Sequence, residues 1–208
     1  AAARCAAGGY AYAGQTCIHV QRIYVEKDAL PEFRKLLVAN IKELVTGDPL
    51  DEKTDVGPVI DEKSAARIED WLKEAVAKGG KLWAGGERQG LLIPPALVEG
   101  VSHECSLSKE EVFGPVVTLE AVGSKEEALE KMNASRYGLQ AGIFTNDLAF
   151  VQRAFARLEF GGVIVNDIPS FRSDAMPYGG VKDSGVGREG VRSTIEEYTE
   201  AKTLVLKA

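Results

Sequence analysis

Cysteine and histidine side chains are the groups in this sequence best suited to nucleophilic or metal chemistry. There are three cysteines and two histidines: Cys5, Cys17, Cys105, His19 and His103. Cys17 ends the run Gly14-Gln15-Thr16-Cys17, in which the glycine allows a substrate to approach the thiol closely. A thiolate is a strong nucleophile, and its attack on a carbonyl divides one difficult reaction into two easier ones. From this run alone, a buried structural cysteine is the favoured interpretation.

The spacing of these residues favours neither a disulfide framework nor a zinc site. The number of cysteines is odd, no Cys-x-x-Cys occurs, and the two histidines are far apart in the sequence. We therefore expect no metal site, and free thiols indicate a reducing compartment, the cytoplasm. A cysteine hydrolase or acyl-transfer enzyme that pairs Cys17 with His19 or His103 stays an open alternative, although no papain-like pattern surrounds Cys17.

A glycine motif near the end of the chain invites comparison with dinucleotide-binding turns. Gly185-Val186-Gly187-Arg188-Glu189-Gly190 matches G-x-G-x-x-G, but such a turn needs a strand before it and a βαβ unit around it. Loop-forming residues precede Gly185, and few residues follow it. We interpret the motif as a flexible loop that enters the last helix.

The elements that must position these residues alternate between strands and helices. Strands are expected at 18–25, 81–84, 91–98, 116–122, 139–145, 163–165 and 203–206. Helices are expected from the cap Asp28 to Gly47, around 68–76, from the capping box Ser124/Glu127 to Met132, after the cap Asn146, and over 189–198. This alternation predicts an α/β domain of three layers, with a mostly parallel sheet flanked by helices.

Length and charge limit the classes of partner. The 208 residues suit one domain, and a hydrophobic fraction of 45% is enough for a core. The net charge of −6 argues against nucleic acid or an anionic membrane as the main partner. No apolar run reaches the roughly 18 residues of a membrane helix, and the first residues lack the pattern of a signal peptide. The absence of an initiator Met leaves open whether the sequence is a whole protein or a piece of one.

Several segments together resemble the NAD(P)-dependent aldehyde dehydrogenase superfamily. Gly14-Gln15-Thr16-Cys17 with the following 20–25 resembles the catalytic-cysteine segment of that family, and Glu111-Val112-Phe113-Gly114-Pro115-Val116 resembles its E-x-F-G-P-V cofactor segment. Further matching segments follow in family order: 137–144, 162–166, 177–185 and 198–202. Because the ordered set runs from about residue 10 to the end, it is far more specific than a lone G-Q-x-C.

The resemblance implies roles for the residues in these segments. Cys17 would attack an aldehyde to form a thiohemiacetal, pass a hydride to NAD or NADP, and leave a thioester that is hydrolysed to a carboxylic acid. Glu111 would bind the nicotinamide ribose, because a carboxylate accepts two hydroxyl groups well. Phe113 would pack beside it. Cys105 matches no motif and is expected to be structural.

The resemblance also implies a loop that lines the aldehyde tunnel. Phe171 and Tyr178 would be its aromatic walls, and Arg172 would bind an anionic or hydroxylated substrate. Pairing of Arg172 with Asp174 on the surface is an equal alternative. We expect His19 to serve in packing.

The family's longer chain implies a division into parts. Residues 1–198 would be the cysteine-bearing catalytic domain and 199–208 an oligomerisation strand, as in a homodimer or homotetramer. The cofactor-binding domain and the general base would lie outside this chain, so that the chain alone would be inactive. The sequence selects neither the aldehyde nor NAD over NADP, and a non-enzymatic assembly domain is a further alternative.

Overall fold

A computed structural model describes residues 1–207, and its centre is a four-stranded sheet of order β1-β4-β3-β2. The strands are β1 (Arg22–Glu26), β4 (Val116–Val122), β3 (Ala96–Glu99) and β2 (Lys81–Ala84). β4 pairs in parallel with β1 and β3, whereas β2 is antiparallel to β3. The apolar run of β4 is almost wholly buried, as expected of a central parallel strand. The predicted α/β class, with a mostly parallel sheet flanked by helices, is confirmed.

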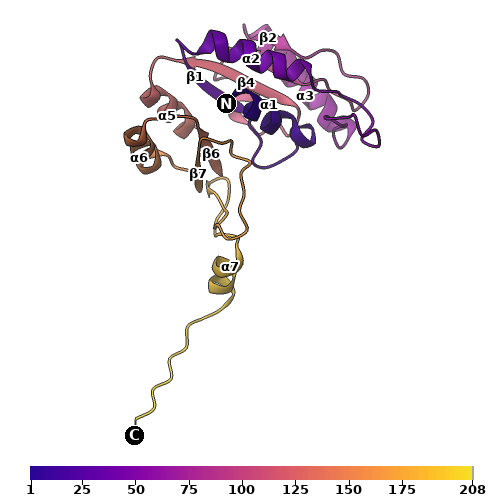
Figure 1. The fold of residues 1–208 in the computed structure, drawn as a ribbon. Helices are drawn as coiled ribbons and strands as arrows, with labels where there is room; N and C mark the ends of the chain where they lie inside the picture. Colours follow the sequence, from indigo (N-terminus) through magenta and orange to yellow (C-terminus); the bar gives the residue numbers. More distant parts are fainter. Residues whose placement is uncertain (208) are drawn as a thin grey trace.

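Helices α1 (Ala2–Tyr10), α2 (Leu30–Lys42) and α3 (Glu62–Ala77) pack around this sheet, and a short α4 (Ser106–Lys109) contacts α3 (Figure 1). The sequence pattern did not predict α1, because its alanines and glycines give no polar face. Those small residues allow a close approach: a Cβ at Gly9 would overlap Val117 of β4. The buried hydroxyl of Tyr10 donates to the Ala96 carbonyl at 3.0 Å and fixes α1 against β3.

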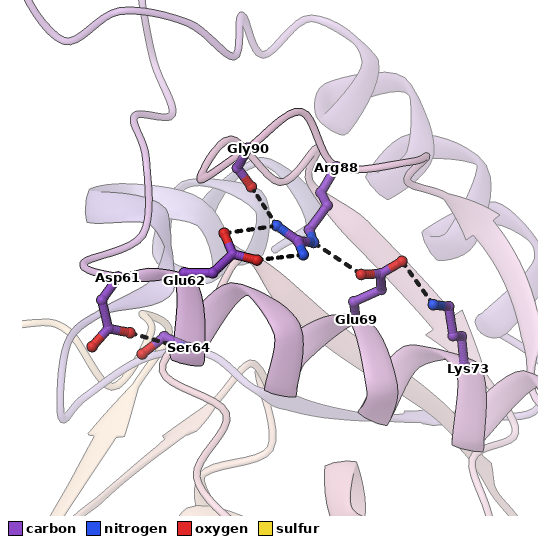
Figure 2. A network of polar contacts seen from close by, with 7 residues as sticks. All are labelled: Asp61, Glu62, Ser64, Glu69, Lys73, Arg88 and Gly90. Atoms are coloured by element: carbon purple, nitrogen blue, oxygen red, sulfur yellow. Dashed lines mark hydrogen bonds and ion pairs between the residues drawn. The ribbon is translucent and has the colours of Figure 1, made fainter.

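Arg88, from the loop between β2 and β3, binds that loop to α3 (Figure 2). Its guanidinium lies 2.6 Å from the Glu62 carboxylate and 2.9 Å from that of Glu69, both on α3. It also donates to the carbonyl of Gly90 in its own loop at 2.9 Å. One cation therefore joins two turns of the helix to the loop that follows β2.

A smaller lobe with its own core follows the main sheet. It contains α5 (Lys125–Asn133), β6 (Gln140–Ile143), α6 (Leu148–Arg157) and β7 (Gly162–Val165), with β6 and β7 in parallel. Its core consists of apolar side chains from these elements: Leu129, Ala141, Ile143, Phe150, Ala154 and Leu158. Two short antiparallel strands, β5 (Tyr137–Gly138) and β8 (Val181–Lys182), join this lobe to the later glycine-rich segment.

Several predicted element boundaries were wrong, and the strand expected at 91–98 is confined to Ala96–Glu99. The first strand begins at Arg22 instead of Ile18, because 18–21 turn: the N–H of His19 donates to Thr16 and that of Gln21 to His19. Helix α2 starts after Ala29 and ends at Lys42, before Gly47, because both backbone groups of Val45 bind the 55–56 segment. The cap of α6 is Asp147, whose carboxylate accepts from the Phe150 N–H at 2.9 Å, and not Asn146.

The glycine motif at 185–190 lies in a loop before α7 (Val191–Tyr198), as predicted. Gly185, Gly187 and Gly190 have φ angles of 116°, 79° and 119°. The expectation that no strand precedes it was wrong in detail, since β8 ends at Lys182. That strand is antiparallel to β5, so it forms no βαβ unit.

The C-terminal residues extend away from the rest of the chain (Figure 1). Within residues 1–207, the expected strand at 203–206 has no pairing partner, and residue 208 lies outside the described part. Leu204, Val205 and Leu206 are 80–85% exposed. No helix within 1–207 combines the length and apolar character needed to cross a membrane.

Candidate active site

Cys17 lies in a turn between the 3-10 helix η1 (Ala11–Gly14) and β1. Tyr12, Ala13 and Gly14 all have left-handed backbone conformations, with φ angles of 57°, 54° and 68°. Two consecutive non-glycine residues in this region are unusual and mark a turn that the surrounding structure holds in place. The chain thus leaves α1 through a strained reversal that presents Cys17 before β1 begins.

Cys17 is the one exposed thiol of the three. Cys5 and Cys105 are buried, and burial raises the pKa of Cys5 to about 11. A thiol with so high a pKa carries little thiolate at neutral pH. The expectation that Cys105 is structural agrees with its burial, and Cys17 is the accessible thiol.

The turn before Cys17 is in backbone contact with the 111–116 segment. A Cβ at Gly14 would overlap the carbonyl oxygen of Gly114, so this contact requires a glycine at position 14. Gln15, beside Gly14, accepts from the Ile60 N–H at 2.9 Å and donates to the Pro58 carbonyl at 3.3 Å. The turn is therefore held from two sides.

Gln21 fixes the same segment through its side chain. Its amide nitrogen donates to the carbonyls of Leu107 at 3.0 Å and Glu110 at 2.7 Å, while its amide oxygen accepts from the Val112 N–H at 2.8 Å. These bonds set the path of the backbone on both sides of Glu111. Gln21 was not predicted as a site residue, and the only signal for it in the sequence is a polar residue at an apolar position of the predicted strand.

A cavity of about 440 Å³ joins Cys17 to Glu111 and Phe113. Desolvation raises the pKa of the Glu111 carboxyl group. Within residues 1–207 this carboxylate has no ion pair or hydrogen bond; the nearby Arg136 binds Glu110 at 2.7 Å instead. Phe113 is 40% exposed at a φ of 41°. A carboxylate without a protein partner in the described residues and an exposed ring, both in the cavity that Cys17 borders, fit a ligand with hydroxyl groups and a flat surface.

The loop after β7 brings Tyr178, one of the three predicted substrate residues, to Cys17 and places a second, Arg172, on the Tyr178 ring. The Tyr178 hydroxyl lies 3.0 Å from the Cys17 sulfur. The guanidinium of Arg172 lies over the Tyr178 ring, 3.7 Å from its centre. In the described part of the chain no ion pair joins Arg172 to Asp174, so that alternative is not observed. Phe171 is 46% exposed and does not line the cavity that holds Glu111.

Neither histidine is arranged as a base for Cys17. His19 Nε2 lies 2.8 Å from the Gly9 carbonyl, and burial lowers the pKa of the ring to about 4, so the ring is neutral at pH 7 and donates to Gly9. His103 is an exposed side chain whose Nε2 lies 3.9 Å from the Glu120 carboxylate. This geometry gives no support to the cysteine–histidine hydrolase and agrees with packing for His19.

Comparisons with known proteins agree with this geometry. The sequence model of the aldehyde dehydrogenase family matches residues 1–204. The chain is 49% identical over 194 residues to a lactaldehyde dehydrogenase of Methanococcus maripaludis, covering 93% of this chain and 42% of that protein. It is 47% identical to a 3-sulfolactaldehyde dehydrogenase of Priestia megaterium, covering 93% of this chain and 41% of that protein.

A solved structure is similar over almost the whole chain. It is aldehyde dehydrogenase 21 of Physcomitrella patens in complex with the reaction product succinate, with a TM-score of 0.96 and 48% identity. The match covers 99% of this chain and 43% of that one. The chain thus spans about two fifths of the length of the proteins it matches.

Proposed function

This chain belongs to the aldehyde dehydrogenase family, and we propose that it supplies the nucleophile with which an NAD(P)-dependent enzyme oxidises an aldehyde to a carboxylic acid. The observation that carries the proposal is the position of Cys17, the exposed thiol. It borders the cavity that contains Glu111 and Phe113, and it touches Tyr178 of the other loop. A nucleophile that lies between a proposed substrate contact, Tyr178, and the proposed cofactor contacts fits a reaction in which the substrate passes a hydride to a cofactor.

Cys17 forms the covalent intermediates. Its sulfur bonds to the aldehyde carbon, and the carbonyl electron pair moves to the oxygen, giving a thiohemiacetal. NAD(P), when bound, would supply the acceptor for the hydride that leaves this carbon. Cys17 then holds the acyl group as a thioester until water displaces it as the carboxylic acid and restores the thiol.

Glu111 and Phe113 are the proposed cofactor contacts within this chain. The Glu111 carboxylate is free of protein partners in the described residues, so it is available to accept two ribose hydroxyls. Phe113 presents an exposed ring beside it. Gln21 acts on both through the backbone, because it binds the residues before and after Glu111.

Arg172 supports a small aldehyde with a hydroxyl or anionic group as the substrate class. Its guanidinium stacks on Tyr178 beside Cys17 and has no ion-pair partner within 1–207, so it is available to bind an anion. Lactaldehyde and 3-sulfolactaldehyde dehydrogenases are among the relatives, and the similar structure from Physcomitrella patens is in complex with the reaction product succinate. Phe171 and Tyr178 would form the walls of this entrance.

The test is oxidation of such aldehydes by the protein expressed from its complete reading frame. Lactaldehyde, 3-sulfolactaldehyde and succinate semialdehyde are offered with NAD or NADP, and reduced cofactor is measured. The variant Cys17→Ser is expected to abolish turnover, whereas Cys105→Ala, a buried thiol outside the site, keeps it. Undiminished turnover by Cys17→Ser would refute the proposed role of Cys17.

We extend the proposal to assembly and compartment. Residues 1–198 form the cysteine-bearing unit, and 199–208 form a strand that adds to the sheet of a neighbouring copy in a homo-oligomer. The exposure of Leu204, Val205 and Leu206 supports this, because an exposed apolar segment with unpaired backbone groups is stabilised when it pairs with the edge of a sheet. Light scattering of the full chain and of 1–198 tests it, and an unchanged oligomeric mass after truncation would contradict it.

The three free thiols support a location in the cytoplasm, because its reducing conditions keep cysteines unpaired.

A further inference from the structure

The hydroxyl of Tyr178 is within hydrogen-bond distance of the Cys17 sulfur, at 3.0 Å. The two residues are 161 positions apart in the chain, so this contact is a product of the fold. In the described part of the chain it is the only side-chain hydrogen bond to that sulfur. An aromatic wall, the role expected for Tyr178, needs no hydroxyl, and the hydroxyl therefore requires its own explanation.

The ring of Tyr178 is held in one place. Its backbone N–H donates to Glu189 at 3.0 Å and its carbonyl accepts from the Glu189 N–H at 2.6 Å, forming a short antiparallel bridge. Arg172 covers one face of the ring at 3.7 Å, and the residue is 8% exposed. With the backbone paired and the ring packed, the hydroxyl cannot easily turn away from Cys17.

The direction of the hydrogen bond follows from the chemistry of the two groups. Burial raises the pKa of the Tyr178 phenol, which therefore keeps its proton at neutral pH. A thiol is a weak donor, and a thiolate only accepts. The phenol is thus the donor, and its bond strengthens when the sulfur becomes negative, because hydrogen bonds to charged acceptors are the stronger ones. The cation of Arg172 on the ring face withdraws electron density from the phenol and favours donation.

His19, the other group that could activate the Cys17 thiol, is not positioned to do so. His19 is two residues from Cys17, but its Nε2 is committed to Gly9 and its buried ring is neutral at pH 7. An imidazolium that would stabilise the thiolate, as in cysteine–histidine pairs, is not available from this residue.

We infer that Tyr178 is a catalytic residue of the proposed reaction, donating its phenolic proton in a hydrogen bond to the Cys17 sulfur and stabilising the thiolate that attacks the aldehyde. The inference rests on the proposed function, because it assumes that Cys17 is the nucleophile. No proton is transferred: the phenol keeps its O–H bond while the thiol loses its proton to solvent. As the sulfur forms its bond to carbon and its charge passes to the carbonyl oxygen, the hydrogen bond weakens again.

The test compares alkylation of Cys17 by iodoacetamide in the wild type and in Tyr178→Phe across the pH range, with peptide mapping to quantify each thiol. Near neutral pH, the variant is expected to react about 10-fold more slowly, because it holds less thiolate. At strongly alkaline pH, where the thiol is ionised in both proteins, the variant is expected to react at least as fast, because a sulfur without this bond is the better nucleophile. A general loosening of the fold would instead accelerate alkylation at every pH.

Controls separate this effect from misfolding. Cys5 and Cys105 are buried and become labelled only if the fold opens. Tyr198→Phe, which removes an exposed hydroxyl on α7, is expected to react like the wild type. Replacing Tyr178 with 3-fluorotyrosine keeps the packing and strengthens the donor, so it is expected to accelerate alkylation near neutral pH. Wild-type or faster rates near neutral pH in Tyr178→Phe would overturn the inference.

A second measurement distinguishes the two proposals. If Cys17→Ser abolishes aldehyde oxidation while Tyr178→Phe alkylates like the wild type, the role of Tyr178 fails and the proposed function stands. If Cys17→Ser oxidises aldehydes undiminished, the proposed function fails, whatever the alkylation profile.

Discussion

Gly14 packs directly against the carbonyl group of Gly114, so the turn that presents Cys17 touches the segment that carries Glu111 and Phe113. Gly14 also has a φ of 68°, a left-handed conformation that glycine adopts without strain. The spacing between the thiol and the proposed cofactor contacts therefore depends on Gly14, whose lack of a side chain lets the two backbones meet.

Gly14→Ala is expected to destabilise the protein by about 3 kcal/mol or more, because the new Cβ must displace the backbone of Gly114 in addition to straining φ. Thermal and denaturant unfolding measure the loss. Gly90→Ala is the matched control: its φ is 60°, but nothing lies within 4 Å of the added Cβ. It is expected to cost only about 1 kcal/mol. Equal losses in the two variants would contradict the close contact at Gly14.

His19 makes stability depend on pH in a defined direction. Burial lowers its pKa to about 4 from 6.5, so between these values the unfolded chain binds a proton that the folded protein does not. The contribution of this residue to stability therefore falls as the pH drops from about 6.5 to about 4, by about 3 kcal/mol in total. His19→Gln keeps a donor for the Gly9 carbonyl and removes the titration.

The measurement for His19 is the free energy of unfolding of both proteins at neutral pH and near pH 4. The variant is expected to gain on the wild type as the pH falls, since carboxylate effects are common to both. A constant difference across this range would show that the ring is free to take up its proton in the folded state.

The cap of α6 supplies a third prediction. Asp147→Ala is expected to cost about 1 kcal/mol, because the Phe150 N–H loses its acceptor and Lys125 loses an ion pair at 3.1 Å. Asn146→Ala changes an exposed neighbour without capping contacts and is expected to leave the denaturation midpoint in place. A larger loss of stability in Asn146→Ala than in Asp147→Ala would show that Asn146 is the cap, as the sequence pattern indicated.

The error at Asn146 illustrates which features the sequence could predict. Apolar periodicity predicted β4 to the residue, because a buried parallel strand must be an apolar run. Asn146 and Asp147 are both good caps, and only the backbone geometry selects between them. Helix α1 gave no such signal, since its buried stripe of Ala2, Cys5, Ala6 and Gly9 consists of small residues and its exposed face also carries alanines.

In the candidate site, too, the sequence could predict some features and not others. Cys17, Glu111 and Tyr178 could be singled out through ordered motifs that resemble a family. The contact between the Tyr178 hydroxyl and the thiol could not, because it joins residues 161 positions apart and depends on one hydroxyl orientation. Gln21 was missed for a similar reason: its partners are backbone groups more than 80 residues away, which leave no mark in the sequence.

Gln21 gives the last prediction, which separates positioning from general stability. Gln21→Leu keeps the size of the side chain but leaves the buried N–H of Val112 and the carbonyls of Leu107 and Glu110 without this partner. Each unsatisfied group costs about 1–3 kcal/mol, so the variant is expected to be less stable by a few kcal/mol. Because the released segment carries Glu111, the KM for NAD(P) is expected to rise more than kcat falls. Gln21→Glu keeps the acceptor for the Val112 N–H and loses the donors. Its stability and its KM for NAD(P) are expected to lie between those of the wild type and those of Gln21→Leu. If both variants lose stability while the KM for NAD(P) stays unchanged, Gln21 supports the fold and does not position the cofactor contacts.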